Sequence, residues 1–167
     1  MGLTYGYECK ICDYKFIANL GVGFRFPEVY QRTVEEMKAG VYGELGSIFF
    51  ELYPEGAIEI YETAYRCKKC GDYKSLPRLS MYIPNEGYHH EPAKERWTVS
   101  YPWDGTDYIS LGEIREHYTL LEEYDHRCTC GGEMESITKQ GDLIDKEDMI
   151  CPHCNIPLDC YWMEQWD

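Results

Sequence analysis

Eight of the nine cysteines in this chain form four closely spaced pairs, and these pairs constrain the fold more than any other feature. The pairs are Cys9-x-x-Cys12, Cys67-x-x-Cys70, Cys128-x-Cys130 and Cys151-x-x-Cys154, with Cys160 left over. A tight turn with two cysteines brings two sulfur atoms to one metal ion, and two such turns complete a tetrahedral site. The eight paired cysteines therefore predict two metal sites of four thiolates each.

The residue after each pair supports this prediction. These four residues are Asp13, Gly71, Gly131 and Asn155. Glycine, asparagine and aspartate are the residues that adopt a positive φ at low cost, as a tight turn requires. The third pair has a gap of one residue instead of two, and we expect Gly131 and Gly132 to supply the freedom that the missing residue would have given. The short pair is therefore interpreted as a closed half-site.

The start of the chain, MGLTYGYECK, lacks the apolar stretch of a secretory signal, and no apolar run approaches the length of a membrane span. We therefore expect a soluble, cytoplasmic protein without membrane association. Thiols stay reduced in that compartment, so clustered cysteines indicate metal binding rather than disulfides.

The segments KCG at 69–71 and CPHC at 151–154 resemble the knuckles of zinc ribbons and rubredoxins. The resemblance covers the four knuckles and a few flanking residues, and it implies hairpin knuckles that hold one metal ion per module. The first ion would be bound by Cys9, Cys12, Cys67 and Cys70, and the second by Cys128, Cys130, Cys151 and Cys154. Two structural Zn²⁺ ions per chain are expected, and iron, in a rubredoxin-like electron carrier, is the alternative. Zinc ribbons serve many processes, so the resemblance implies no particular function.

The predicted fold class is α+β, with two small β-rich zinc-ribbon modules. The first module would span 1–80 and contain a helical insertion at about 27–53; the acidic second module would span 108–167. Between them, 81–107 contains prolines, glycines and aromatic residues, which is typical of a packed connector.

Local patterns place several elements. Pro27 suits a helix start and Gly40 a helix end, with Tyr30, Val34, Met37 and Val41 on one face. A second short helix fits Leu45, Ile48, Phe49 and Leu52, and a strand fits the residues that lead into Cys67.

Ser110 and Glu113 have the spacing of a capping box before a helical face of Leu111, Ile114, Tyr118 and Leu121. Near the end, Ile156, Leu158, Cys160 and Trp162 fit one face of a strand, which makes Cys160 a small buried hydrophobe.

The net charge of −14 is concentrated in the second half of the chain. Residues 1–80 carry 10 Lys+Arg and 11 Asp+Glu, whereas residues 81–167 carry 6 and 19. A basic protein partner is therefore favoured, and the first hypothesis is a protein-interaction or adaptor module, one form of which is an acidic inhibitor or immunity-type protein. The predicted interface residues are Trp97, Tyr101, Trp103 and Trp166.

The second hypothesis is nucleic-acid binding through the first module, although the net charge opposes it. The possible contacts are Lys10, Lys15, Lys68, Lys69 and Lys74, with Tyr7, Tyr14, Phe16 and Tyr73 between them for base stacking. No catalytic constellation is visible, because four thiolates fill a zinc shell and no phosphate loop or nucleophile motif is present. His126, His153 and the pair His89–His90 are interpreted as surface or supporting residues.

Overall fold

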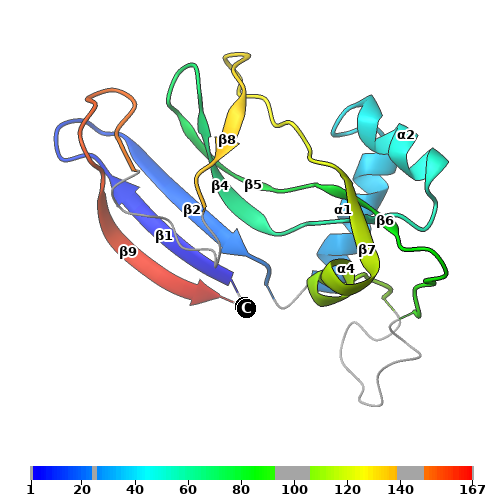
Figure 1. Ribbon diagram of the computed structural model, residues 1–167. Coiled ribbons are helices and arrows are strands. Elements are labelled where there is room, and N and C mark those ends of the chain that lie inside the picture. Colours follow the sequence, from blue (N-terminus) through cyan, green and yellow to red (C-terminus); the bar gives the residue numbers. More distant parts are fainter. Residues whose placement is uncertain (1, 24–25, 93–105, 139–148, 167) are drawn as a thin grey trace. The chain divides into compact units, whose positions relative to one another are not determined.

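A computed structural model of the chain describes residues 2–23, 26–92, 106–138 and 149–166 (Figure 1). The chain divides into two compact units. The first, called the metal unit here, comprises Met1–Phe24, Tyr61–Arg78 and Asp125–Asp167; the second, called the inserted unit, comprises Arg25–Ile60 and Leu79–Tyr124. These units differ from the predicted ranges 1–80, 81–107 and 108–167, because the first and last segments of the chain belong to the same unit.

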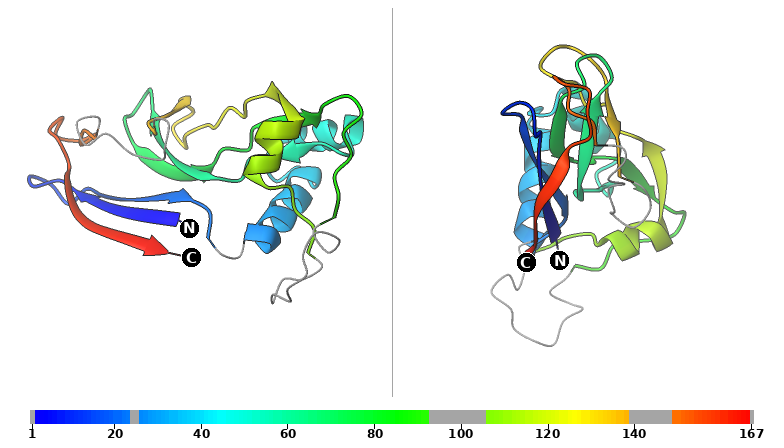
Figure 2. Two further views of the ribbon diagram at one scale, coloured as in Figure 1. Left: turned by 60° about the horizontal axis from the view of Figure 1, so that its bottom comes forward. Right: turned by 90° about the vertical axis from the view of Figure 1, so that its left-hand side faces the viewer.

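The metal unit contains one antiparallel sheet of six strands. The strands are β1 (Gly2–Glu8), β2 (Lys15–Gly21), β4 (Glu62–Cys67), β5 (Tyr73–Pro77), β8 (Met134–Ser136) and β9 (Asp159–Trp166). Their order is β5-β4-β2-β1-β9, and β8 pairs with the end of β4. Strand β9 lies beside β1 in all the views of Figures 1 and 2, so the two ends of the chain meet in this sheet.

Two parts of the metal unit repeat one arrangement. Strands β1 and β2 form a hairpin whose turn holds Cys9 and Cys12, and β9 pairs with β1. Strands β4 and β5 form a hairpin whose turn holds Cys67 and Cys70, and β8 pairs with β4. In each case the third strand follows another cysteine pair and joins the first strand of the hairpin. The second arrangement is nested in sequence within the first.

Alternate residues of β1 contribute to the core of the metal unit. Tyr7 is buried, and Leu3 and Tyr5 pack against the same core, which also contains Phe16, Ala18, Leu20, Tyr73, Met149 and Leu158. A bulge in β9 sets Trp162 opposite Gly6 and Cys160 opposite Tyr7, with Tyr161 as the extra residue. A Cβ on Gly6 would lie 2.8 Å from Tyr161 Cζ, so a larger residue there would have to displace this exposed ring. Cys160, predicted to be buried, is partly buried against the core, and Trp162 is 41% exposed.

The inserted unit contains the two predicted helices, α1 (Phe26–Lys38) and α2 (Glu44–Leu52). Pro27 lies in the first turn of α1, and Gly40 follows the helix with a φ of +76°. Tyr30 and Met37 are buried as the periodicity predicts. Val41 is 66% exposed, because α1 ends at Lys38 and the predicted face does not extend that far.

The sheet of the inserted unit has the order β3-β6-β7, formed by β3 (Ala57–Ile58), β6 (Met81–Pro84) and β7 (Tyr118–Glu122). Strand β6 lies in the predicted connector, so this part of 81–107 belongs to a packed unit. Helix α4 (Leu111–His117) begins at Ser110, whose Oγ accepts a hydrogen bond from the N–H of Glu113 as the capping box predicts. The chain then continues as β7, so Tyr118 lies in a strand and not on the predicted helical face.

Helices and sheets together are compatible with the α+β class, and they are arranged differently from two consecutive modules. Among the described residues, none of the helices is both long enough and apolar enough to cross a membrane.

Candidate metal centres

The structure brings all eight paired cysteines together, in a grouping that differs from the predicted one. The terminal cluster consists of Cys9, Cys12, Cys151 and Cys154, and the central cluster consists of Cys67, Cys70, Cys128 and Cys130. The prediction joined consecutive pairs, whereas the structure joins the first pair with the fourth and the second with the third. The physical reason is strand pairing: β9 is hydrogen-bonded to β1, and β8 to β4.

The sulfur atoms in each cluster are spaced for one tetrahedral ion. The Sγ atoms of Cys67 and Cys130 lie 3.5 Å apart, and those of Cys70 and Cys128 lie 3.7 Å apart. In the terminal cluster the Sγ atoms of Cys12 and Cys151 lie 3.7 Å apart. A tetrahedron with metal–sulfur bonds of about 2.3 Å has edges of about 3.8 Å, whereas a disulfide bond measures about 2.05 Å. The distances therefore fit metal binding and not disulfides.

Three of the four knuckles have the predicted backbone conformation. The values of φ at Gly71, Gly131 and Asn155 are +76°, +78° and +55°. Asp13 is not among the described residues with positive φ, so this part of the prediction is wrong for the first knuckle. That knuckle is still closed by a hydrogen bond from Cys9 N–H to the Tyr14 carbonyl, at 3.0 Å, which corresponds to the bond from Cys67 N–H to the Asp72 carbonyl.

The short pair Cys128-x-Cys130 forms a knuckle that closes one residue earlier than the others. The N–H of Cys67 bonds the carbonyl five residues ahead, at Asp72, whereas the N–H of Cys128 bonds the carbonyl four residues ahead, at Gly132. Gly131 supplies the positive φ. Gly132 has a different role: a Cβ there would lie 2.7 Å from Cys67 Sγ. The two glycines thus compensate for the missing residue, one through its backbone angle and one by leaving room for the opposing knuckle.

In every pair the first cysteine is buried and the second is more exposed. Backbone N–H groups point at the buried sulfur atoms. The N–H groups of Cys70 and Lys69 each lie 3.4 Å from Cys67 Sγ, and together they lower the pKa of the Cys67 thiol to about 6. The N–H of Ile11 likewise lowers the pKa of Cys9 to about 7.

Other thiols in the clusters, such as Cys70 and Cys154, ionise less readily, because their pKa values are raised. The neighbouring thiol of Cys12, together with burial, raises the pKa of Cys154 to about 12. Four thiolates in one cluster would repel one another strongly, and a divalent cation at their centre removes that repulsion. The donor set and its spacing therefore fit a metal ion that is held entirely by the protein.

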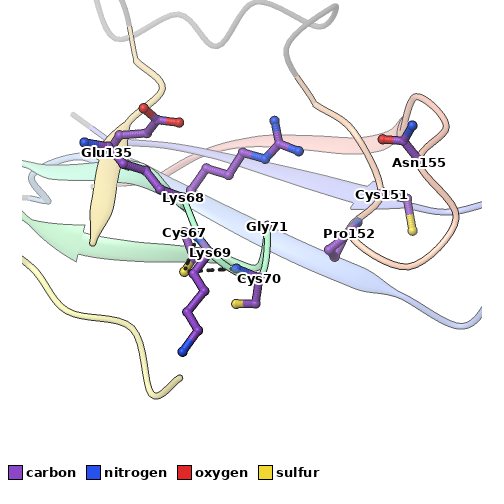
Figure 3. A pocket seen from close by; sticks show the side chains of 10 residues that line it. Cys67, Lys68, Lys69, Cys70, Gly71, Glu135, Cys151, Pro152 and Asn155 are labelled. Carbon is purple, nitrogen blue, oxygen red and sulfur yellow. Dashed lines mark hydrogen bonds between the residues drawn. The ribbon is translucent and has the colours of Figure 1, made fainter. Parts of the chain in front are cut away.

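A pocket of about 360 Å³ lies between knuckles of the two clusters, and its lining includes residues 66–71, Glu135, Cys151, Pro152 and Asn155 (Figure 3). Gly71 and Pro152 approach each other closely, because a Cβ on Gly71 would lie 3.3 Å from Pro152 Cβ. Of the basic residues here, Lys68 pairs with Glu133 at 3.1 Å, and Lys69 Nζ donates to the Cys130 carbonyl at 3.1 Å.

The predicted nucleic-acid contacts separate into two groups. The lysines are at least partly exposed, but Lys10 pairs with Asp159 at 2.6 Å and Lys15 with Glu8 at 3.3 Å; Lys74, on β5, is half-buried. The aromatic residues proposed for base stacking are mostly core residues: Tyr7, Phe16 and Tyr73 are buried. That part of the nucleic-acid hypothesis is wrong, because alternation along the strands turns these rings toward the core.

Other predicted site residues can also be placed. His126 is buried and donates to the Pro77 carbonyl at 2.7 Å, and neither His126 nor His153 belongs to a cysteine cluster. Trp97, Tyr101 and Trp103 lie outside the described residues, as does the side chain of Trp166. Sequence reasoning missed His90, interpreted as a surface residue; its side chain is 13% exposed and lies between two carboxylates.

Comparisons of this chain with models of protein families, with curated proteins and with solved structures found no match.

Paired substitutions distinguish the two possible groupings of cysteines. The variant Cys12→Ser, Cys151→Ser removes two ligands from the terminal cluster alone and should retain one metal ion per chain. The variant Cys12→Ser, Cys70→Ser damages both clusters and should retain almost none. Metal content after gel filtration with a mild chelator measures this difference. The reverse result would show that consecutive pairs share an ion.

Gly132→Ala should weaken metal binding in the central cluster, because the new methyl group would overlap Cys67 Sγ and the side chain of Lys69. We expect the metal content to fall from two ions toward one per chain. Gly112→Ala is the matched control, since a Cβ there meets only Ser110 Oγ at 3.9 Å. Equal metal retention by Gly132→Ala and Gly112→Ala would contradict this account of the short knuckle.

Proposed function

We propose that this chain is a zinc protein in which both cysteine clusters are structural and the inserted unit binds a basic protein partner. Four thiolates fill a tetrahedral shell and leave no position for a reacting water molecule. Each cluster also joins a hairpin to a knuckle that is distant in sequence, so a metal ion there would hold separate parts of the chain together. Iron would fit the same sulfur cage, so the choice of zinc rests on its prevalence in closed sites of this kind.

The purified protein should be colourless and contain two zinc ions per chain by elemental analysis. A strong chelator should unfold the metal unit, because a structural zinc ion contributes on the order of 10 kcal/mol to folding. Loss of β-sheet signal in circular dichroism, reversed by added zinc, would measure this. A red protein that contains iron would instead support the electron-carrier alternative.

The observation that carries the proposed interaction is an apolar stripe on helix α2. Leu45, Ile48 and Leu52 are 38%, 47% and 68% exposed, and their spacing of three and four residues places them on one side of the helix. The adjoining side of the helix is also apolar, with Phe49 and Phe50 buried. The apolar surface of α2 is therefore wider than the part that its own unit covers, and a partner would cover the remainder. The three exposed residues are called the α2 stripe.

The charge of the inserted unit indicates what kind of partner would cover the α2 stripe. This unit carries 6 Lys+Arg and 16 Asp+Glu, a net charge of −10, and Glu44 and Glu51 lie on α2 itself. Two copies of such a unit would repel each other, whereas a basic protein with an apolar surface is complementary in both respects. An inhibitor that caps a basic enzyme, such as a nucleic-acid-binding one, is a concrete form of this function.

A short synthetic helix of leucine and lysine tests the interaction. We expect the protein to bind this peptide with an affinity that falls as salt is added. A matched peptide of leucine and glutamate should not bind. Ile48→Glu should weaken binding by about fivefold or more, since it replaces exposed apolar area that the peptide would bury. Ile17→Glu, at a 51% exposed position of β2, is the control. Fluorescence anisotropy measures each affinity.

Three results would contradict the proposal. One is equal binding of both peptides, and another is no binding of either. The third is a stable dimer that Ile48→Glu dissociates in analytical ultracentrifugation, which would make a second copy the occupant of the stripe. Binding of a single-stranded oligonucleotide in place of the basic peptide would favour the nucleic-acid alternative.

A further inference from the structure

A second binding feature of the inserted unit is a pocket of about 310 Å³ beside helix α1. Val34, Phe50, Pro54 and Ile109 contribute apolar walls, and Glu35 and Asp107 contribute carboxylates. Such a pocket suits a side chain with an apolar stem and a cationic end. None of the residues that line it belongs to the cysteine clusters.

Asp107 is held in place by a buried chain of polar groups. Its Oδ1 lies 2.8 Å from Nε2 of His90, and Nδ1 of His90 lies 2.5 Å from Oε1 of Glu113. The Glu113 side chain is only 5% exposed, and it also accepts a hydrogen bond of 2.6 Å from the Tyr88 hydroxyl. Each ring nitrogen of His90 is thus opposite a carboxylate oxygen, so the ring cannot rotate without losing both contacts. The carboxylate of Asp107 is therefore fixed in position at the pocket.

Asp107 remains accessible in this arrangement, since 48% of its side chain is exposed while His90 is 13% exposed. A fixed carboxylate that is reached from solvent loses little conformational freedom when it binds a cation. The apolar walls reduce competition from water near the Asp107 carboxylate, which strengthens its electrostatic attraction for a cationic ligand.

One aromatic ring of the lining, Phe50, already contacts a cation of the protein itself. Nζ of Lys38 lies 5.1 Å from the centroid of the Phe50 ring, within the range of a cation–π contact. Lys38 also lines the pocket, so its charge would repel an incoming cation. The pocket consequently contains two carboxylates that attract a cationic ligand, Asp107 and Glu35, and one group that opposes it, Lys38.

We propose that this pocket binds the guanidinium group of an arginine side chain presented by a basic protein partner. A guanidinium is preferred to an ammonium because its planar group can stack on an aromatic ring and donate two hydrogen bonds to one carboxylate. His90 and Glu113 act as positioning residues for Asp107. This inference rests on the proposed function for the nature of the partner, but the pocket can be tested without a partner.

N-acetyl-L-argininamide is the probe, titrated into the metal-loaded full chain and followed by NMR shifts of the backbone amides in α1 and residues 107–109. We expect weak, saturable binding, on the order of millimolar for so small a ligand. Asp107→Asn should weaken it by about tenfold or more, since a charge-assisted hydrogen bond is lost. Lys38→Gln should strengthen it, because the opposing charge is gone. N-acetyl-L-lysinamide should bind more weakly than the arginine probe.

Two further variants complete the experiment. Val34→Phe fills the pocket without changing a charge and should also abolish binding, so the test does not depend on the folding of Asp107→Asn alone. Glu122→Gln, on β7, removes an exposed carboxylate outside the pocket lining and should leave binding unchanged. Binding that survives both Asp107→Asn and Val34→Phe, or that Glu122→Gln reduces equally, would overturn the proposal.

The pocket and the proposed function can fail separately. If argininamide binds in a manner that depends on Asp107, but the leucine–lysine peptide does not bind, the pocket is supported and the function is wrong. If the peptide binds through the α2 stripe, but argininamide shifts no amide near the pocket, the function is supported and the pocket assignment is wrong.

Discussion

The antiparallel pairing of β9 with β1 is the interaction on which the metal unit depends. It extends along the whole of β1, from Gly2 opposite Trp166 to Glu8 opposite Asp159, and it continues into the knuckles that hold Cys9 and Cys151. Forming this contact closes a loop that contains nearly all of the chain, which carries an entropic cost. A metal ion in the terminal cluster would offset part of this entropic cost, because it would hold Cys9 and Cys12 together with Cys151 and Cys154.

The same design recurs inside this loop, where β8 joins β4 and the central cluster ties their knuckles together. The inserted unit is composed of two segments of the chain that are separated in sequence by Tyr61–Arg78. Strand β3 from the first segment pairs with β6 from the second, at Ala57 opposite Tyr82. Folding of the inserted unit therefore also requires contacts between residues that are far apart in sequence, such as those that place His90 beside Glu113.

Features governed by local physics were predicted well from the sequence. The positive φ at Gly71, Gly131 and Asn155, the two helices of the insertion and the Ser110 cap all depend on a few consecutive residues. The predicted grouping of cysteines, which joined consecutive pairs, was wrong, because four knuckles can be combined into two sites in three ways and their spacing does not distinguish them. The sequence contained only a weak signal for the observed grouping. Strand β1 pairs on both sides, and only one of its partners, β2, is close in sequence. His90 was missed for a related reason, since both of its carboxylate partners lie more than a helical turn away.

The cysteine clusters also change how the basic residues are understood. In the sequence, Lys10, Lys68 and Lys69 among aromatic residues are typical of a nucleic-acid surface. In the structure the aromatic rings are largely core, and the lysines surround two groups of sulfur atoms that would each retain a charge of −2 around one divalent ion. Lys69 Nζ bonds the backbone of the central cluster, and Lys68 and Lys10 each meet a carboxylate beside a knuckle. Local neutralisation of thiolates and nearby acids accounts for these lysines, and the proposal of a basic partner therefore draws on the charge of the inserted unit instead.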